Sequence, residues 1–320
     1  MGFVDFEGRR YERRDGESVL DALLRCGVEV SHSCKAGSCG ACMMRATGGA
    51  VPEKAQAGLK DTWKARGYFL SCACTPDGDL AVATAEADTQ TPARVVDLEL
   101  VSGDVMRVRL RCEGEFDFRA GQYLTLRTAA GVARSYSIAS LPEDGVVELH
   151  VRLLAGGRMS EWLRSEARAG DGVAVQGPAG DCFYLPGDVE QPLLLAGTGT
   201  GLAPLYGIVR DALRSGHRGP VRLFHGALRV EGLYLREELR RLAALHENFE
   251  YVAAVLAGEG PDVEVGEMDG VILRRIPDLK GWRGYVCGDP PLVQKLKKKL
   301  FLSGMAMRDI HADAFLPPAA

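Results

Sequence analysis

Three cysteines near the start of the chain stand at a spacing that few folds accommodate. Cys34, Cys39 and Cys42 follow a C-x4-C-x2-C pattern in the stretch CKAGSCGAC, and Cys72 follows after 29 further residues. Four thiolates can ligate the two irons of a [2Fe–2S] cluster, with three ligands from one tight loop and the fourth from a distant segment. The residues between the first three cysteines are nearly all small, which lets backbone N–H groups approach the sulfurs. The pattern therefore favours an iron–sulfur site.

Zinc is the competing interpretation of these cysteines. Structural zinc sites usually take their ligands from two separated C-x2-C pairs, and the C-x4-C arm has no place in such a site. Small buried thiols without any metal are the other alternative. Cys74 competes with Cys72 for the fourth ligand position, and Cys26 falls in a helical stretch, where we interpret it as a packing residue.

The complete spacing resembles that of plant-type ferredoxins, and the resemblance covers the first quarter of the chain. In that family the fourth ligand precedes a proline by four positions, as Cys72 precedes Pro76. The resemblance implies that Cys34, Cys39, Cys42 and Cys72 are the ligands of the cluster. It also implies a β-grasp ferredoxin domain at the N-terminal end of the chain.

Length and composition bound the number of domains and the setting in which the protein works. A chain of 320 residues is too long for one core and predicts two or three domains. No apolar run is long enough to cross a bilayer, the N-terminus lacks the build of a signal peptide, and a net charge of −4 gives no sign of nucleic-acid binding. Nine cysteines, an odd number, favour a reducing compartment over a disulfide scaffold. We therefore expect a cytoplasmic protein without membrane or nucleic-acid partners.

The first expected domain spans residues 1–88. In it, SVLDALLRCG predicts a helix with Ser18 as its cap and Gly27 as its stop. The stretch AVATAEADTQTPA then loses apolar periodicity, which places the first boundary at about residues 85–93. Residues 93–188 follow with several short strand-like runs and Gly-rich turns, which predict an antiparallel β-barrel.

The barrel segment carries the quartet Arg134, Ser135, Tyr136 and Ser137. An arginine can hold a flavin phosphate, an aromatic ring can lie on the isoalloxazine, and a small hydroxyl can approach its reactive N5. Taken alone, the quartet could equally be the outward face of an ordinary strand. It resembles the R-x-Y-[ST] motif of the ferredoxin–NADP reductase superfamily, which implies a flavin-binding barrel with Arg134, Tyr136 and Ser137 as contacts.

The same superfamily resemblance extends to a glycine-rich turn at the start of a predicted helix, GGRMSEWL. Free N–H groups at such a turn can take a pyrophosphate. The resemblance implies that the flavin contacts there are Gly156, Gly157, Met159 and Ser160. Ser160 is also a candidate helix N-cap.

From residue 189 to residue 320, strand-like runs alternate with helix-like ones, which predicts a parallel α/β nucleotide-binding domain. Its first strand runs into five loop residues whose glycines permit close approach to a pyrophosphate: Gly197, Thr198, Gly199, Thr200 and Gly201. The stretch GTGTGLAP resembles the nicotinamide-binding loop of the superfamily. A tight strand-to-helix turn without a ligand is the alternative for this loop.

Two segments near the C-terminus complete the resemblance. YVCGDPP is similar to the CGPP motif of the superfamily, with Asp289 where proline is usual, and it implies that Cys287 and Gly288 lie near the nicotinamide. Phe315 in IHADAF stands where relatives place an aromatic ring against the flavin, although a terminal hydrophobe could also simply fill a groove. The resemblance thus implies that hydride transfer takes place among Ser137, Cys287 and Phe315.

The order of ferredoxin, flavin and nicotinamide motifs resembles that of the reductase components of multicomponent aromatic-ring oxygenases. With the ferredoxin at the N-terminus, the resemblance implies FAD as the flavin, NADH as the electron donor, and a terminal oxygenase or a separate ferredoxin as the partner. Arg229 is the one clear cation near the expected 2′-position of the adenosine ribose, and Glu231 follows it closely, which favours NADH over NADPH. A carrier module reduced by another protein, and a different client such as a sugar-deoxygenating dehydratase, remain the alternatives.

Overall fold

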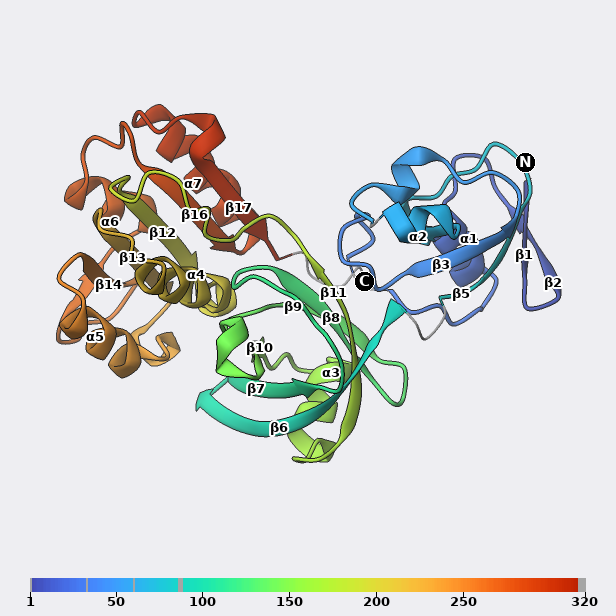
Figure 1. The fold of residues 1–320 in the computed structure, drawn as a ribbon, viewed down its shortest axis with the longest axis horizontal. Coiled ribbons are helices and arrows are strands. Elements are labelled where there is room, and N and C mark those ends of the chain that lie inside the picture. The colour runs from blue at the N-terminus through green and yellow to red at the C-terminus, as the bar shows by residue number, and fades with distance from the viewer. Residues whose placement is uncertain (1, 33, 60, 86–88, 316–320) are drawn as a thin grey trace.

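The computed structural model describes residues 2–32, 34–59, 61–85 and 89–315. Within them the chain builds three sheets in sequence order, and Figure 1 shows the first beside the second and the third on the far side of the second. This agrees with the expected combination of a β-grasp ferredoxin fold, an antiparallel barrel and a parallel α/β fold. Residues 86–88, inside the first expected domain boundary, lie outside the described part of the chain.

The first sheet is mixed and has the order β2-β1-β5-β3-β4. Strand β1 runs parallel to β5, and β3 runs antiparallel to β5. Its elements are β1 (Gly2–Phe6), β2 (Arg9–Arg13), α1 (Val19–Arg25), β3 (Met43–Gly48), α2 (Asp61–Ala65), β4 (Tyr68–Leu70) and β5 (Leu80–Thr84). Ser18 caps α1 by accepting a hydrogen bond from the N–H of Asp21, and Gly27, at φ +78°, follows its end. The start and stop predicted for this helix are confirmed.

The second sheet is antiparallel and has the order β10-β7-β6-β11-β8-β9. Its strands are β6 (Thr91–Ser102), β7 (Val105–Cys112), β8 (Tyr123–Thr128), β9 (Ala133–Ser137), β10 (Val147–Arg152) and β11 (Gly172–Ala179). An isolated bridge between Ile138 and Leu149 brings β9 back to β10 and closes the barrel. The short helix α3 (Arg158–Glu161), followed by a π-helical turn (Trp162–Glu166), covers one end.

The third sheet is parallel and has the order β15-β14-β13-β12-β16-β17. Its strands are β12 (Leu193–Thr198), β13 (Val221–Ala227), β14 (Phe249–Val255), β15 (Val263–Val265), β16 (Arg283–Gly288) and β17 (Ile310–Ala314). Its helices are α4 (Leu202–Arg214), α5 (Arg236–Leu245), α6 (Met268–Arg275) and α7 (Pro290–Leu302). One hydrophobic cluster joins the sheet to α4 and α5, and another joins it to α6 and α7, so both faces are covered.

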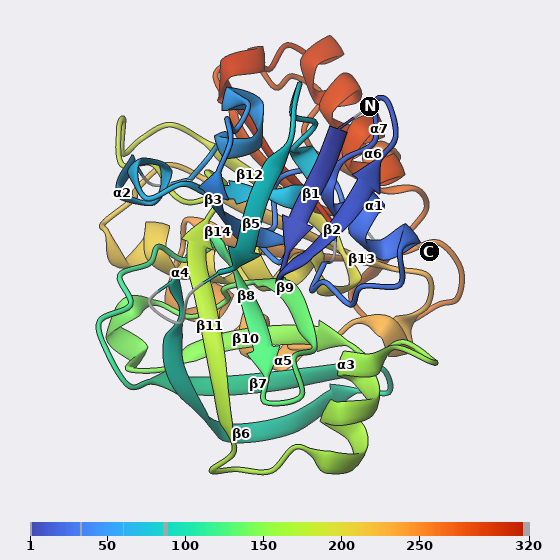
Figure 2. The same ribbon diagram turned by 90° about the vertical axis from the view of Figure 1, so that its right-hand side faces the viewer.

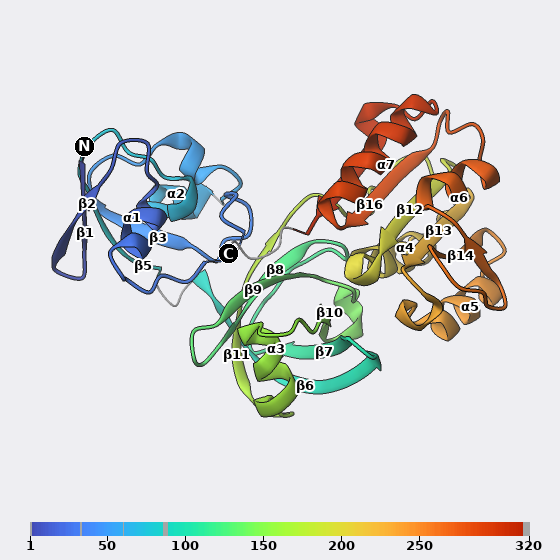
Figure 3. The same cartoon turned by 180° about the vertical axis from the view of Figure 1, so that it is seen from behind.

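Hydrogen bonds from the barrel strands β8 and β9 hold the segment before β3 that carries Cys34, Cys39 and Cys42, called the metal loop or cysteine loop below. Tyr123 Oη donates to the carbonyl of Ser38 at 2.6 Å, and Arg134 Nη1 donates to the carbonyl of His32 at 3.2 Å. Figures 2 and 3 show the first sheet standing over the ends of these strands. The acceptors in both bonds are main-chain carbonyls, so the path of the loop itself sets this junction.

Within the described residues, no helix combines the length and the apolar character needed to cross a membrane. One packing prediction is wrong: Cys26 is exposed, because α1 ends at Arg25 and the residue forms the helix C-cap.

Candidate active site

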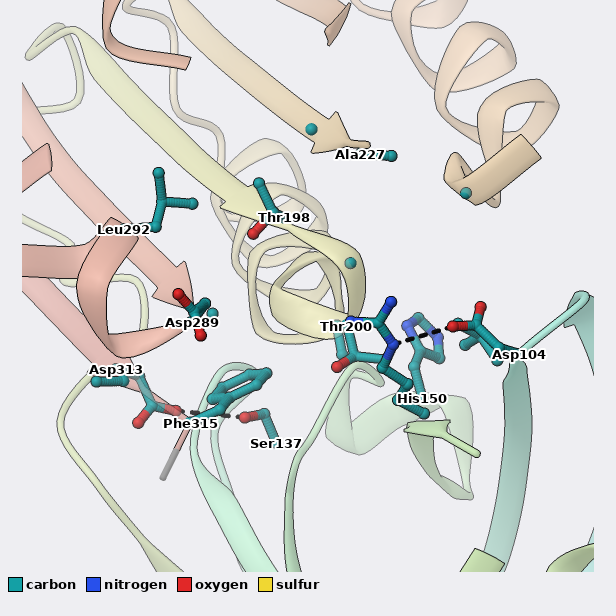
Figure 4. A pocket seen from close by; sticks show the side chains of 18 of the residues that line it. Asp104, Ser137, His150, Thr198, Thr200, Ala227, Asp289, Leu292, Asp313 and Phe315 are labelled. Atoms are coloured by element: carbon teal, nitrogen blue, oxygen red, sulfur yellow. Dashed lines mark hydrogen bonds and ion pairs between the residues drawn. The ribbon is translucent and has the colours of Figure 1, made fainter. Parts of the chain in front are cut away.

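A single cavity of about 1080 Å³ lies where the three units meet. Its lining includes two cysteines and a serine of the metal loop, the four residues of the flavin quartet, the nucleotide loop and the C-terminal strand: Cys34, Ser38, Cys39, Arg134–Ser137, Thr198, Gly199, Thr200, Asp313, Ala314 and Phe315. Figure 4 shows Ser137, Asp313 and Phe315 together on one side of it, and Thr200 near His150 and Asp104 on the other. Residues expected to serve three cofactors therefore share one space.

The four expected metal ligands lie in two pairs. Cys42 Sγ is 3.3 Å from Cys72 Sγ, and a hydrogen bond from Cys39 lowers the pKa of Cys34. In the described part of the chain, no group of three or more His, Cys, Asp or Glu side chains is arranged to hold one metal ion. Two thiol pairs match a cluster of two irons with two protein ligands each, whereas one zinc ion needs all four ligands to converge.

The backbone of the loop also fits a sulfur-rich group. The Ala36 N–H points at Cys34 Sγ at 3.3 Å, and the pKa of Cys72 is lowered by a hydrogen bond from the Cys42 thiol and, to a lesser extent, by one from the Gly37 N–H. Cys74 is different, because it is fully buried in the hydrophobic core of the first unit, where burial raises its pKa to about 12. The structure thus brings Cys72 to the other thiols and leaves Cys74 as a packing residue.

The flavin quartet forms β9, which pairs with β8. All four side chains line the cavity, and Tyr136 also packs against the barrel core, where burial raises the pKa of its phenol. Arg134 lies at the metal-loop side, where it donates to the carbonyls of His32 and Ala133. A guanidinium has five N–H donors, so these two bonds leave donors for an anion.

The glycine-rich turn lies at the start of α3, with Gly157 as its N-cap. Gly157, Met159 and Ser160 line the cavity, together with Arg158, which the sequence did not indicate. Ser160 is inside the helix and its hydroxyl accepts from the N–H of Leu154 at 2.9 Å, so it is not the N-cap. Gly156, at φ +69°, makes the turn but is not part of the lining.

Two glycines of the nucleotide loop are required by packing. A Cβ atom on Gly197 would lie 2.8 Å from the carbonyl oxygen of Cys287, and one on Gly201 would lie 2.3 Å from the same atom. Both distances are far below van der Waals contact, so any side chain would push the loop away from β16. The contact leaves Thr198, Gly199 and Thr200 facing the cavity at the start of α4.

Cys287 is not among the residues that line the cavity, and its expected place near the nicotinamide stays a prediction. Its side chain is fully buried in the core beneath α4, and its Sγ lies 3.6 Å from Cys182 Sγ, while the neighbouring Gly288 and Asp289 line the cavity. Side chains alternate along a strand, and at this strand end the cysteine faces inward.

Asp313 takes a place in the cavity that the sequence did not indicate. It stands opposite Cys287 in the register of β16 and β17, and its carboxylate accepts a hydrogen bond from Ser137 Oγ at 3.3 Å. Burial raises the pKa of Asp313 to about 6. Phe315 lies beside this pair and is held by its N–H, which donates to the carbonyl of Gly288 at 2.8 Å.

The outer end of the cavity follows the ends of β13 and β14. Leu228, Arg229 and Glu231 all line it, and Leu228 is 70% exposed. Across the nucleotide loop, Arg152 donates to Asp104 at 2.9 Å and its guanidinium lies 3.7 Å from the Cβ position of Gly199.

Comparisons with known proteins agree with this arrangement. Three family profiles match: a 2Fe-2S iron-sulfur cluster binding domain over residues 3–77, an oxidoreductase FAD-binding domain over 92–184, and an oxidoreductase NAD-binding domain over 195–298. The ferredoxin–NAD(P)+ reductase component of the naphthalene 1,2-dioxygenase system of Pseudomonas putida is 37% identical, with 94% of each chain covered. The reductase subunit of an aromatic O-demethylase of an Amycolatopsis species is 35% identical, with 98% of each chain covered.

The chain belongs to the family of oxygenase reductase components. Among solved structures, this reductase resembles the Amycolatopsis cytochrome P450 reductase GcoB with a TM-score of 0.72, at 33% identity and complete coverage of both chains. It also resembles a ferredoxin reductase of carbazole 1,9a-dioxygenase with a TM-score of 0.67, at 25% identity and 98% coverage of each. The reductase is an oxidoreductase whose domains serve a [2Fe–2S] cluster, FAD and a nicotinamide dinucleotide.

Proposed function

We propose that this reductase accepts hydride from NADH onto FAD and passes single electrons through its [2Fe–2S] cluster to a terminal oxygenase or to a separate ferredoxin. The observation that carries the proposal is the shared cavity, in which the cysteine loop, the flavin strand and the nucleotide loop face one another. When bound, a flavin exchanges electrons in pairs with a nicotinamide and one at a time with a cluster, which joins the two chemistries.

In this function the side chains bind and orient the cofactors and are not needed as acids or bases. Arg134 would hold a flavin phosphate, the turn of Gly157 to Ser160 would take the pyrophosphate, and Tyr136 would lie on the flavin ring. Ser137, with its hydroxyl directed toward Asp313, would stand at the reacting edge, with Phe315 over the same place. Gly197 to Gly201, with Gly288, would seat the dinucleotide at the start of α4.

The domain boundaries and the cellular compartment of the protein are part of the proposal. The units would span residues 1–88, 93–188 and 189–320, supported by strand ends at Thr84 and Ala179 and the strand start at Leu193, whereas β6 starts at Thr91, two residues before the second range. All nine cysteines are described and none is in a disulfide, which favours the reducing cytoplasm.

Anaerobic mixing with NADH tests the function. Bleaching of the flavin followed by reduction of the cluster, in the isolated protein, is the expected result. A flavin that stays oxidised with NADH and is reduced only by another protein would instead identify a carrier module.

We predict one FAD per chain rather than FMN. The cavity extends from Arg134 on the flavin strand to the N–H groups at the start of α3. Donors at both places fit the two phosphates of FAD, whereas FMN has one phosphate. Mass spectrometry of the cofactor released by denaturation gives the answer, and the mass of FMN would refute the assignment.

We predict that kcat/KM is higher for NADH than for NADPH by about fivefold, because the carboxylate of Glu231 beside the 2′-position would repel a phosphate by about 1 kcal/mol. Glu231→Gln should narrow this gap, and Arg229→Ala should remove what NADPH activity remains. A wild-type preference for NADPH that disappears in Arg229→Ala would show that the arginine dominates the site.

A further inference from the structure

We propose that Thr125 and Ser135 are positioning residues that clamp the metal loop to the flavin strand and thereby set the rate at which an electron passes between the flavin and the cluster. The proposal rests on the function proposed above. One electron crosses this junction at a time, lost on the flavin side and gained on the cluster side, with no bond made or broken.

The clamp consists of two hydroxyls and one carbonyl. Thr125 Oγ1 donates to the carbonyl oxygen of Cys39 at 2.5 Å, Ser135 Oγ lies 3.3 Å from the same oxygen, and the two hydroxyl oxygens are 3.0 Å apart. A carbonyl oxygen has two lone pairs and can accept both bonds. Each hydroxyl has a single proton, so two hydrogen bonds form at a time: Thr125 donates to the carbonyl, and Ser135 donates either to the same carbonyl or to Thr125 Oγ1.

The pairing of β8 with β9 fixes the positions of both hydroxyls independently of the metal loop. Thr125 and Ser135 stand directly opposite each other in the register of β8 and β9, so their side chains leave the sheet on the same face. Thr125 is 1% exposed. Loss of the Cys39 carbonyl would leave the buried Thr125 hydroxyl with only the Ser135 hydroxyl as a partner, so the bond to the carbonyl resists separation of the two units.

The two ends of the clamp are the residues that matter for electron transfer. Cys39 is an expected ligand of the cluster, and Ser135 precedes Tyr136, the expected ring contact of the flavin. Other junction bonds reach residues that precede this ligand in the chain, from Tyr123 to Ser38 and from Arg127 to Ser31 at 2.8 Å. Among the hydrogen bonds between the described residues of this junction, only those of Thr125 and Ser135 contact a ligand residue itself.

Electron tunnelling falls steeply with distance, so a looser junction slows the flavin-to-cluster step and leaves the nicotinamide-to-flavin step unchanged. Thr125→Val removes the hydroxyl with little change of shape, and Thr125→Ser keeps it. Thr84→Val, at an exposed position at the end of β5, is the matched control for the same substitution.

The experiment uses the full-length protein with its cofactors in an anaerobic stopped-flow instrument. With Thr125→Val we expect flavin bleaching by NADH at the wild-type rate and cluster reduction slowed by about fivefold or more, the factor that the loss of one hydrogen bond commonly gives. Amide hydrogen exchange over residues 34–42 should rise by about the same factor, a readout independent of turnover. Thr125→Ser should restore both, and Thr84→Val should change neither.

Each outcome decides one question. Equal rates of cluster reduction and equal exchange in Thr125→Val and the wild type would overturn the clamp. Absence of bleaching in the wild type would overturn the proposed function instead. If Thr125→Val lowers the iron content, Ser135→Ala carries the same test: slower cluster reduction supports the clamp and an unchanged rate overturns it.

Discussion

Replacing Cys72 with serine is expected to leave the purified protein without its cluster. Cys72 Sγ stands 3.3 Å from Cys42 Sγ, so its removal takes one of the two thiolates available to one iron. The measured iron content should fall from about two irons per chain to near zero. NADH should still drive reduction of dyes or ferricyanide through the flavin, while turnover of the oxygenase partner should be lost.

Cys74→Ser is the matched control, two residues along the same segment. Its side chain is buried in the hydrophobic core, so the serine hydroxyl should cost about 1–2 kcal/mol of folding free energy and leave the iron in place. Full iron content in Cys72→Ser together with loss in Cys74→Ser would reverse the ligand assignment. Partner turnover in a protein proved to be free of iron would show that electrons leave by another route.

Gly201→Ala is expected to disable the nucleotide site. The added Cβ would lie 2.3 Å from the carbonyl of Cys287, a backbone atom that cannot turn aside, so the loop must move away from β16. Overpacking of this kind costs about 1–3 kcal/mol. Thermal unfolding should show this loss, and KM for NADH should rise by about tenfold or more as the start of α4 shifts.

Gly103→Ala controls for the change of glycine to alanine itself. A Cβ on Gly103, in the turn between β6 and β7, would meet no atom within 4 Å. Unchanged stability and KM are expected there. A Gly201→Ala protein that matches Gly103→Ala in both measurements would mean that the loop tolerates the displacement.

The fold follows closely from local patterns. Alternating apolar residues and turn signals predict the strands β6 to β10, and helical periodicity with Gly stops predicts α1, α4, α5 and α7. β11 is missed, although its residues Val173 and Val175 are buried, because GVAVQGPA is rich in small residues and contains a proline. β17 is missed for a similar reason, since IHADA holds one apolar strand former and its partner β16 is distant in sequence.

The same difference between local patterns and long-range pairing applies to the site residues. Motifs that lie in one continuous segment predict cavity positions well, as the quartet at Arg134–Ser137 and the loop at Thr198–Thr200 illustrate. Asp313 could not be predicted, because it reaches Ser137 only through the pairing of β17 with β16. The motif at Cys287 gives the residue type but carries no information on which face of the strand the side chain takes, and the structure buries it.

The metal loop offers the barrel its main-chain carbonyls at His32, Ser38 and Cys39, and the barrel supplies the side chains that reach them. Every amino acid carries a carbonyl, so these attachments constrain the path of the loop and, apart from the Ser31 hydroxyl that accepts from Arg127, leave its side chains free to diverge. A ferredoxin domain taken from a relative, with a different outer surface but the same loop path, would present the same acceptors. The reductase is therefore built so that its electron outlet can be exchanged or adapted to a new client without redesign of the flavin side.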